Sequence, residues 1–482
     1  MRNRRVLNLK QLIVAACATA LVTGTSTVAA YAETTLDVTG MNVLEGLAPM
    51  ATEIGKAALA SNFTVSGDIQ SGKAKQPLLL SFPDQQQQAV RDAFISNVAY
   101  ELADGLGSEL GKAYQTAIGP LRGEDCKRST STISSPTLST VDRVIRFANA
   151  TQRHNSDLAK YFFANETINS NGDPAPVEAR AIMDRVNGIP NVFGTYSVLD
   201  GKDRPKLCEH KSNSVGNPRP FLTEPNLTVY SGKSFFNNNT TNAAYLCDCT
   251  DLAQSPAYPS GHTSYGYMES LLLALLVPER YQQMVTRAAE YGNDRIVLGA
   301  HYAMDVLAGR TLAEYDLAQL LANKTGYVGV KRDDVEIADF QKALQDARDA
   351  LTPELKKGCD KSVADCPAAK DQSRFADPVK NSAFYESTQT YGLPVVFTNN
   401  ADGTEDVAKL APEAGYLLTL AFPGLTLPQA DDILTQTEGP GGGFLDNGSA
   451  FGVYSRLDLY KAAEKASAFS RGTPHEVPIS SK

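Results

Sequence analysis

The chain has 482 residues, with 45 basic side chains against 54 acidic ones and a formal net charge of −9. Because this balance is acidic, the composition argues against nucleic acid or an anionic membrane surface as a partner. Basic residues with a role in function are therefore expected to lie within the functional site. The length allows a substantial core in one large domain or two. Beyond the N-terminus no apolar run reaches the length of a bilayer span, so we expect no transmembrane anchor.

The first 32 residues have the layout of a secretory signal peptide. Basic residues precede an apolar, small-residue stretch over residues 12–30, and Ala30-Tyr31-Ala32 is typical of a cleavage site. We therefore expect cleavage near Ala32, a mature chain starting near Glu33, and a periplasmic or secreted location. A faint lipoprotein-like box ending at Cys17 is the alternative, but the apolar part before it is short.

Cysteine usage supports export. The mature chain keeps Cys126, Cys208, Cys247, Cys249, Cys359 and Cys366. An even number in an exported chain favours disulfides, although the connectivity stays open. Cys359 and Cys366 would close a small loop, and Cys208 would pair with Cys247 or Cys249. A zinc site at the last two is the competing interpretation, but their spacing suits zinc poorly.

Several amphipathic helices are predicted in the first half of the mature chain. They cover residues 84–119, 141–163 and 176–187. The first has an apolar residue at every fourth position from Phe94 to Leu110, and Gly119 followed by proline ends it. Residues 188–255 are polar and loop-rich, as expected of the wall around a ligand site.

The central stretch begins another helix at Pro259 and Ser260, and this helix carries a run of leucines. Further helices are predicted over residues 279–291, 303–323 and 334–351. Since no alternating strand pattern competes, we predict an all-α helical bundle over residues 33–330. A loop-rich C-terminal extension, residues 331–482, would pack on that bundle.

Four residues of the central stretch suggest chemistry. His301 and Asp305 are four apart, so on a helix they would share one face, and the carboxylate would fix which imidazole nitrogen carries the proton. Arg295 supplies a permanent planar cation that suits a tetrahedral oxyanion. The helix that begins before His262 offers unpaired N–H groups to an anion. An anion site with two histidines indicates phosphoryl chemistry.

Two motifs carry a family resemblance. Pro259-Ser260-Gly261-His262 and the spacing Arg295-x5-His301-x3-Asp305 resemble the second and third signature motifs of the type 2 phosphatidic acid phosphatase (PAP2) superfamily. The surroundings are most similar to the bacterial class A non-specific acid phosphatases. The resemblance covers about residues 205–322, and it implies the same all-α architecture and phosphatase activity.

The first signature motif of that family is a lysine, six residues and Arg-Pro. This chain has Arg219-Pro220, but Ser212 stands at the lysine position. We expect Lys211 to fill that role if the chain bulges by one residue, and Lys202 if the residues between are an insertion. The third motif also differs, because Asp294 stands where the family usually has serine; this carboxylate could tether Arg295 or weaken phosphate binding.

The resemblance implies a role for each site residue. His301, oriented by Asp305, attacks phosphorus and forms a phosphohistidine, and His262 protonates the leaving group and later activates water. The equatorial phosphate oxygens are held by Lys211, Arg219, Ser260, Gly261 and Arg295. No metal or other cofactor is expected, because these fixed cations stabilise the transition-state charge.

Two other functions remain open. A vanadium haloperoxidase would hold vanadate as its cofactor in the same oxyanion pocket. A non-catalytic phosphate-binding protein is favoured if the missing lysine is essential. The leading interpretation is an exported acid phosphatase acting on small phosphate esters. The particular ester and the oligomeric state, a homo-oligomer included, cannot be inferred from the sequence.

Overall fold

The computed structural model describes residues 53–121, 133, 135–163, 218–249, 252, 255–366 and 371–470. All of these belong to one compact unit, Asp37–Lys482. The expected signal peptide, the expected helix over residues 176–187, and both Lys202 and Lys211 lie outside the described residues. The domain boundary near residue 330 stays a prediction.

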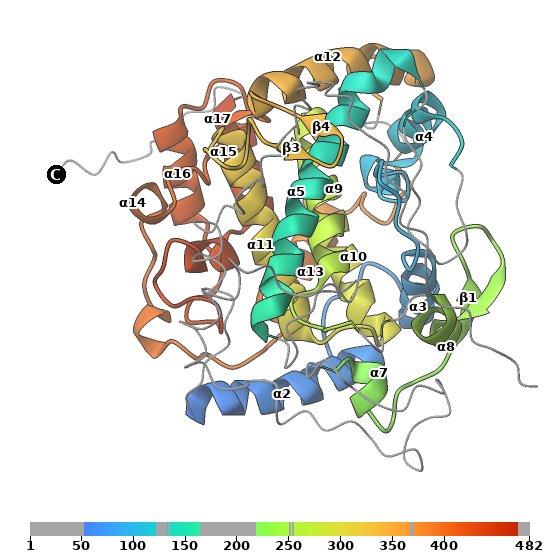
Figure 1. Ribbon diagram of the computed structural model, residues 1–482, viewed down its shortest axis with the longest axis vertical. Helices are drawn as coiled ribbons and strands as arrows, with labels where there is room; N and C mark the ends of the chain where they lie inside the picture. The colour runs from blue at the N-terminus through green and yellow to red at the C-terminus, as the bar shows by residue number, and fades with distance from the viewer. Residues whose placement is uncertain are drawn as a thin grey trace, which may run out of the picture. The chain divides into compact units, whose positions relative to one another are not determined.

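The described chain is helical, as predicted, and its helices are drawn in Figure 1. They are α2 (Glu53–Gln70), α3 (Phe82–Arg91), α4 (Ser108–Ile118), α5 (Ser139–Phe163), α7 (Pro220–Thr223), α8 (Asn242–Ala244), α9 (Gly261–Leu276), α10 (Tyr281–Leu298), α11 (Ala303–Leu321), α12 (Phe340–Cys359), α13 (Pro378–Thr390), α14 (Val407–Leu410), α15 (Tyr416–Thr419), α16 (Leu427–Gln436) and α17 (Leu459–Ser470).

Short antiparallel hairpins are the only strand pairs in the described part of the chain. In one, β1 (Ser231–Lys233) pairs with β2 (Asn239–Thr241); in the other, β3 (Lys331–Arg332) pairs with β4 (Val335–Glu336). The first hairpin lies beside α3, and the second lies beside α5. Neither forms a layer of its own, so the fold class is all-α.

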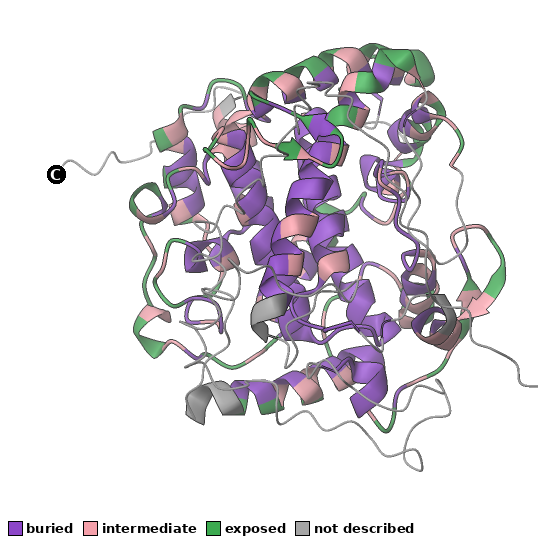
Figure 2. Cartoon of the chain, viewed as in Figure 1, coloured by how far each residue is buried: buried purple, intermediate pink, exposed green. Residues whose placement is uncertain are grey.

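Helix α9 is the centre of the bundle. From Thr263 to Leu276 every residue is buried, because α5, α10 and α11 pack against different faces of the helix (Figure 2). A helix that is apolar or small on all sides is the pattern expected of a core helix. Its sequence therefore specifies the central position, and the helices around it need to be apolar on one face only.

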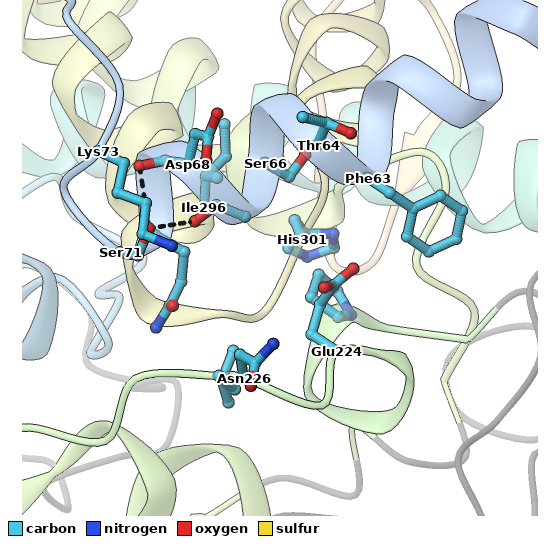
Figure 3. Close-up of a pocket in the computed structure, with 14 residues that line it drawn as sticks. Phe63, Thr64, Ser66, Asp68, Ser71, Lys73, Glu224, Asn226, Ile296 and His301 are labelled. Carbon is cyan, nitrogen blue, oxygen red and sulfur yellow. Dashed lines mark hydrogen bonds between the residues drawn. The ribbon is translucent and has the colours of Figure 1, made fainter.

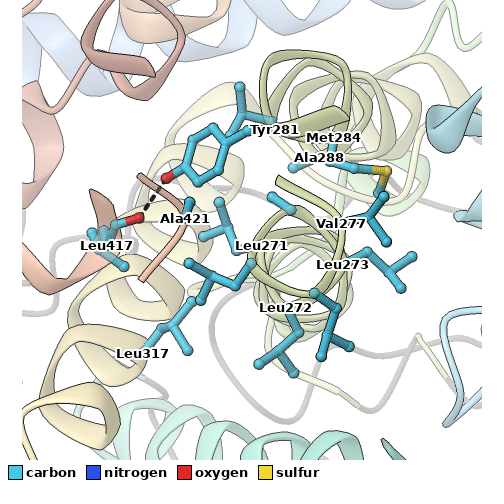
Figure 4. Packing of buried hydrophobic residues seen from close by; sticks show 14 of the residues in the cluster. Leu271, Leu272, Leu273, Val277, Tyr281, Met284, Ala288, Leu317, Leu417 and Ala421 are labelled. Atoms are coloured by element: carbon cyan, nitrogen blue, oxygen red, sulfur yellow. Dashed lines mark hydrogen bonds between the residues drawn. The ribbon is translucent and has the colours of Figure 1, made fainter. Parts of the chain in front are cut away.

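The core around α9 is continuous with the rest of the unit (Figure 4). Leu271 and Leu272 of α9 belong to the same buried cluster as Leu317 of α11 and Leu417 of α15. Burying each leucine side chain contributes about 1.5–3 kcal/mol as an upper estimate. The Tyr281 hydroxyl donates to the Leu417 carbonyl at 2.9 Å, so the start of α10 is also held to the C-terminal region.

The C-terminal region makes a further polar contact with the bundle. Arg374, between α12 and α13, donates to Glu290 of α10 at 2.7 and 2.6 Å and to Asp104 at 2.8 Å. The predicted disulfide between Cys359 and Cys366 is present, with the two Cα atoms 5.9 Å apart. Cys247 is also disulfide-bonded.

The predicted continuous helix over residues 84–119 is wrong. The chain forms α3, leaves the helix at Asp92, makes a short 3-10 turn at Ala103–Leu106 and re-enters a helix at α4. The reason is electrostatic: Asp92 and Asp104 turn inward to bind the buried Arg287, which a straight helix would not allow. The predicted apolar positions from Phe94 to Leu110 are nevertheless all buried.

None of the described helices is both long enough and apolar enough to cross a membrane.

Candidate active site

The predicted site residues gather at one end of the bundle. The N-termini of α9 and α11 and the C-termini of α5 and α10 meet there, and α2 and α7 lie across that end (Figure 1). Two helix N-termini direct positive potential toward the same region. This end of the bundle therefore suits an anion.

The turn between α10 and α11 places His301. Helix α10 ends at Gly299, whose φ of 87° is a left-handed conformation that favours glycine. The next N–H groups, of Ala300 and His301, donate back to the Arg295 carbonyl at 3.0 and 3.3 Å. His301 and Arg295 are therefore held to the same turn although they belong to different segments.

Helix α2 supports the start of α11. The Ser66 hydroxyl accepts a hydrogen bond from the Ala303 N–H at 2.9 Å, and the Asn62 side-chain oxygen accepts one from the Met304 N–H at 3.0 Å. These are N–H groups of the first helical turn, which have no partner inside the helix. The segment that carries His301 is thereby fixed against α2.

His301 and Asp305 are paired, but not on one helix face as predicted. His301 precedes α11, and Asp305 lies in the first turn of that helix, from which its carboxylate reaches back. Its Oδ2 accepts from the Tyr302 N–H at 2.9 Å and lies 3.3 Å from Nδ1 of His301. The carboxylate therefore caps the helix and orients the imidazole at the same time.

Arg219 faces the other nitrogen of His301. Its Nη1 lies 2.8 Å from Nε2 of His301 and also donates to the Ala300 carbonyl at 3.2 Å. Its Nε and Nη2 donate to the Ser255 carbonyl and hydroxyl, both at 3.1 Å. A guanidinium donates only, so Nε2 of His301 carries a lone pair and Nδ1 carries the proton toward Asp305. This is the tautomer that a nucleophile at Nε2 needs.

The start of α9 adds Ser260, Gly261 and His262. Ser260 is the N-cap, with its hydroxyl oxygen accepting from the Thr263 N–H at 3.1 Å, and its own N–H donates to the Asp305 carbonyl at 3.0 Å. The close approach of α11 requires Gly309, because a Cβ there would lie 2.6 Å from the Ser260 carbonyl oxygen. These contacts connect the two helix N-termini directly.

His262 lies close to His301. Its ring centroid is 6.1 Å from that of His301. Nε2 of His262 lies 3.0 Å from the Tyr245 hydroxyl. The two imidazoles are close enough to act on one small group between them.

Arg295 is fully buried, and its guanidinium is only partly used. Its Nη2 donates to the Asp92 carbonyl, and the guanidinium carbon is 4.5 Å from the centroid of the Tyr291 ring. Nε and Nη1 have no hydrogen-bond partner among the described residues. Asp294 points elsewhere: its carboxylate accepts from Gln85, and burial raises its pKa. Of the two possibilities for Asp294, the tether is not seen, because no hydrogen bond or ion pair joins Asp294 to Arg295 among the described residues, although the carboxylate raises the pKa of Arg295.

Lys160 was missed by the sequence analysis. It lies near the C-terminal end of α5, with 5% of its surface exposed, and its Nζ would be 3.6 Å from a Cβ placed on Gly261. One signal was available: Gln152, Ser156 and Lys160 are spaced by four, so on a helix they share one face, and all three are buried. Lysine is almost never fully buried without a partner, so a buried lysine in such a row indicates a functional site.

The cations determine the charge state of the site. Burial lowers the pKa of His301 well below its usual value, and Arg219, His262, Lys160 and Arg295 lower it further. Burial also lowers the pKa of Lys160 to about 8 and that of Arg219 to about 10. Burial raises the pKa of Asp305 to about 7, although the hydrogen bond from the Tyr302 N–H and the charge of Arg219 both lower it. His301 is therefore neutral even in acid.

A cavity of about 260 Å³ opens beside His301 (Figure 3). His301 forms its inner wall, α2 contributes Ser66 and Asp68, and the segment after α7 contributes Glu224 and Asn226. The pKa of Glu224 is raised by burial. No cluster of three or more His, Cys, Asp or Glu side chains that could hold a metal ion occurs in the described parts of the chain.

Comparisons with known proteins identify the family of this chain. A family model described as PAP2 superfamily matches residues 208–317. The non-specific acid phosphatase of Salmonella typhimurium is 34% identical over 185 residues, which cover 37% of this chain and 67% of that protein. The chain belongs to the PAP2 superfamily.

Other PAP2-type relatives match shorter parts. The non-specific acid phosphatase of Providencia stuartii is 29% identical over 174 residues, 36% of this chain and 62% of that protein. The acid phosphatase of Zymomonas mobilis is 38% identical over 108 residues, 22% of this chain and 38% of that protein. The family match at residues 208–317 includes α9, α10 and α11, and each of these relatives covers less than half of this PAP2 protein.

Proposed function

We propose that this member of the PAP2 superfamily, a phosphoric monoester hydrolase, is an exported acid phosphatase that works without a metal through a phosphohistidine at His301. The observation that carries the proposal is the state of His301. Asp305 holds its Nδ1, Arg219 faces its Nε2, and the surrounding cations keep the ring neutral. A neutral, oriented imidazole next to an anion site is an activated nucleophile.

In the first step, the Nε2 lone pair of His301 forms a bond to phosphorus while the bond to the ester oxygen breaks. The Arg219 N–H that now faces Nε2 turns to a phosphate oxygen, a change of partner that needs no large movement because its other donors stay on Ser255 and Ala300. The imidazolium that forms is stabilised by Asp305. The buried carboxylate thus gains a full positive partner in the transition state.

His262 acts as the general acid in the first step and as the general base in the second. The departing ester oxygen takes a proton from the His262 imidazolium, so the electron pair of the broken bond ends on a neutral alcohol. A water molecule then attacks the phosphohistidine, and neutral His262 accepts one proton from it. The products are inorganic phosphate and the free His301, and the charges balance over the cycle.

Fixed cations supply the electrostatic stabilisation. Arg219, Arg295 and Lys160 are close enough to His301 to lower its pKa, and the start of α9 adds its positive potential to theirs. Charge in the transition state lies on the equatorial oxygens, and donors already held in place stabilise it without reorganisation. This set supports a mechanism in which no metal is required.

Lys160 is proposed as the phosphate-binding lysine in place of Lys211. It is buried beside Gly261, and its charge acts on both His301 and Arg219. An ammonium in this position satisfies the chemistry of the first family motif, although it comes from α5 and lies far upstream of Arg219. Lys211 remains an alternative that only measurement can compare with it.

Export is part of the proposal. It is supported by the signal-like layout of residues 1–32 and by the disulfide between Cys359 and Cys366, a kind of bond that persists in oxidising compartments. The expected location is the periplasm or the medium.

The purified mature protein tests this function. We expect hydrolysis of p-nitrophenyl phosphate at acidic pH, unchanged by EDTA and inhibited by vanadate. Activity lost on chelation and restored by a divalent metal would overturn the metal-independent mechanism. Halide oxidation that requires vanadate, without phosphatase activity, would instead identify a haloperoxidase.

A further inference from the structure

The geometry points to Tyr245 as a positioning residue that keeps one ring nitrogen of His262 protonated, so that the other nitrogen performs the acid–base work. The inference rests on the proposed acid–base function of His262. Its basis is the 3.0 Å contact between the Tyr245 hydroxyl and Nε2 of His262, at a tyrosine with only 3% of its surface exposed. The ring centroids of the two residues are 6.4 Å apart in an edge arrangement.

The segment that carries Tyr245 is held from several directions. Thr241 caps α8 by accepting from the Ala244 N–H at 3.0 Å. The Asn242 side chain donates to the carbonyls of Thr228 and Leu298, at 3.0 and 3.3 Å, and accepts from the Tyr230 N–H at 3.1 Å. Because Leu298 is the last residue of α10, the segment is tied to the helix that carries Arg295. A hydroxyl on such a support can orient an imidazole.

The cycle of proton transfers requires one particular tautomer. As an imidazolium, His262 carries protons on both nitrogens; after it protonates the leaving oxygen through Nδ1, the neutral ring keeps the proton on Nε2. The Tyr245 oxygen has two lone pairs and accepts from Nε2–H in both states. Nδ1 then regains a proton from the attacking water. Tyr245 thus orients His262 and fixes its tautomer, as Asp305 does for His301, but it carries no negative charge.

A neutral partner suits His262 better than a carboxylate would. The charged and titratable groups around it are Arg295 on α10, Arg219 before α7, Lys160 on α5, and the pair His301 and Asp305. Arg295 and Arg219 lower the pKa of Tyr245, but burial raises it by more, so the hydroxyl stays un-ionised. A carboxylate here would bind those arginines and compete with the phosphate.

Tyr245→Phe tests the inference, since it removes the hydroxyl and keeps the ring. Alkyl phosphates need a protonated leaving group and aryl phosphates do not, so kcat should fall about tenfold to a hundredfold for an alkyl phosphate and less than about threefold for p-nitrophenyl phosphate. The pH above which kcat for the alkyl ester declines should move down, because the His262 imidazolium loses an acceptor. Equal losses on both substrates, or an unmoved pH profile, would overturn the role.

Tyr230→Phe is the matched control. Its hydroxyl, in the same part of the chain, donates to the Val297 carbonyl at 3.1 Å, and among the described residues no hydrogen bond joins it to a histidine. We expect it to leave the ratio of alkyl to aryl activity and the pH profile unchanged. A changed ratio would mean that loss of any hydroxyl in this segment disturbs His262, which would contradict a specific role for Tyr245.

A measurement on the unaltered protein remains decisive if Tyr245→Phe does not fold. The chain has five histidines, so 15N NMR of the ring nitrogens is practical, with the His262 signals identified by their absence in His262→Ala. Neutral His262 should carry its proton on Nε2. A proton on Nδ1 would overturn the inference, and it would do so without touching the nucleophilic role of His301, which is tested separately.

Discussion

Two arginines on α10, Arg287 and Arg295, are both completely buried, and their surroundings differ in a way that separates structure from function. Arg287 donates to both carboxylate oxygens of Asp92 and to Asp104, each at 2.7 Å. Arg295, two helical turns further on, donates to one backbone carbonyl and has two nitrogens without a partner among the described residues.

The difference shows where a ligand is expected. A buried cation whose donors all face carboxylates is fully compensated, and removing either partner leaves an uncompensated charge. A buried cation with unused donors has its counter-charge supplied from outside the chain, since leaving such donors unpaired costs free energy. Arg287 therefore belongs to the scaffold, and Arg295 is the one of the two that we propose for the phosphate site.

The largest expected effect comes from the nucleophile. His301→Ala should lower kcat by at least about 10⁴-fold, because the attacking atom is removed, while the melting temperature stays within a few degrees. Hydrolysis of p-nitrophenyl phosphate and thermal unfolding measure the two properties. His154→Ala on α5 serves as the control and should keep its activity. A folded His301→Ala protein with ordinary turnover would contradict the covalent mechanism.

The two arginines provide the next test. Arg295→Ala should lower kcat/KM by about 10²–10³-fold with a small change in stability, because it removes a donor to the transition state. Arg287→Ala should reduce the free energy of unfolding by about 3–5 kcal/mol, because it strands Asp92 and Asp104. Kinetics and denaturant unfolding of both variants are compared. If Arg287→Ala damages activity without destabilising the fold, the distinction between the two regions is wrong.

The lysine gives a smaller effect. Lys160→Met should lower kcat/KM by about 10- to 100-fold through loss of one charge-assisted hydrogen bond, and Lys211→Ala and Lys202→Ala should be nearly silent. Since the pKa of Lys160 is about 8, kcat/KM should fall above that pH as the ammonium loses its charge. Lys160→Arg should move this fall to higher pH, because the guanidinium stays protonated. A large effect of Lys211→Ala and none of Lys160→Met would reverse the assignment.

The smallest effect concerns pH and stability. Burial raises the pKa of Glu101 and Asp316 to about 7 and that of Glu314 to about 8. The unfolded chain releases these protons at lower pH than the folded one, so stability should fall as pH rises from about 4 to about 8. The pKa of Asp104 is lowered to about 2, which costs stability only below about pH 4.

Melting temperatures test whether stability falls as the pH rises. We expect the protein to melt at least about 2 °C higher at pH 5 than at pH 8. Glu314→Gln, which imitates the neutral carboxyl, should flatten that difference. A higher melting temperature at pH 8 would show that the ionised network around Arg287 outweighs the buried neutral acids.

The motif-based part of the site could be predicted from the sequence because its residues are local. His262 is the second residue after the helix N-cap, and Arg295, His301 and Asp305 lie across one turn, so their spacing alone predicts that they meet. Lys160 could not be predicted in this way. It reaches the site because α5 runs antiparallel to α9 and ends beside Gly261, and only the packing of α5 on α9 shows this.

The fold shows the same limit in the segment after α3. An apolar residue at every fourth position predicted a helix over residues 84–119, and those residues are indeed in the core. The apolar periodicity predicts which residues are buried, however, and the ion pairs of the neighbouring carboxylates determine where the helix is interrupted. Asp92 and Asp104 had to reach Arg287, a partner nearly two hundred positions away in the chain, and no local pattern contains that information.

Trapping the intermediate tests the central claim most directly. His262→Ala should still be phosphorylated by p-nitrophenyl phosphate, whose leaving group needs no proton, but it should hydrolyse the phosphoenzyme slowly, because no base activates water. Rapid quenching at high pH followed by peptide mapping should therefore find phosphate on Nε2 of His301, and none in the His301→Ala protein. A protein that turns over the substrate without any phosphate bound to His301 would contradict the account.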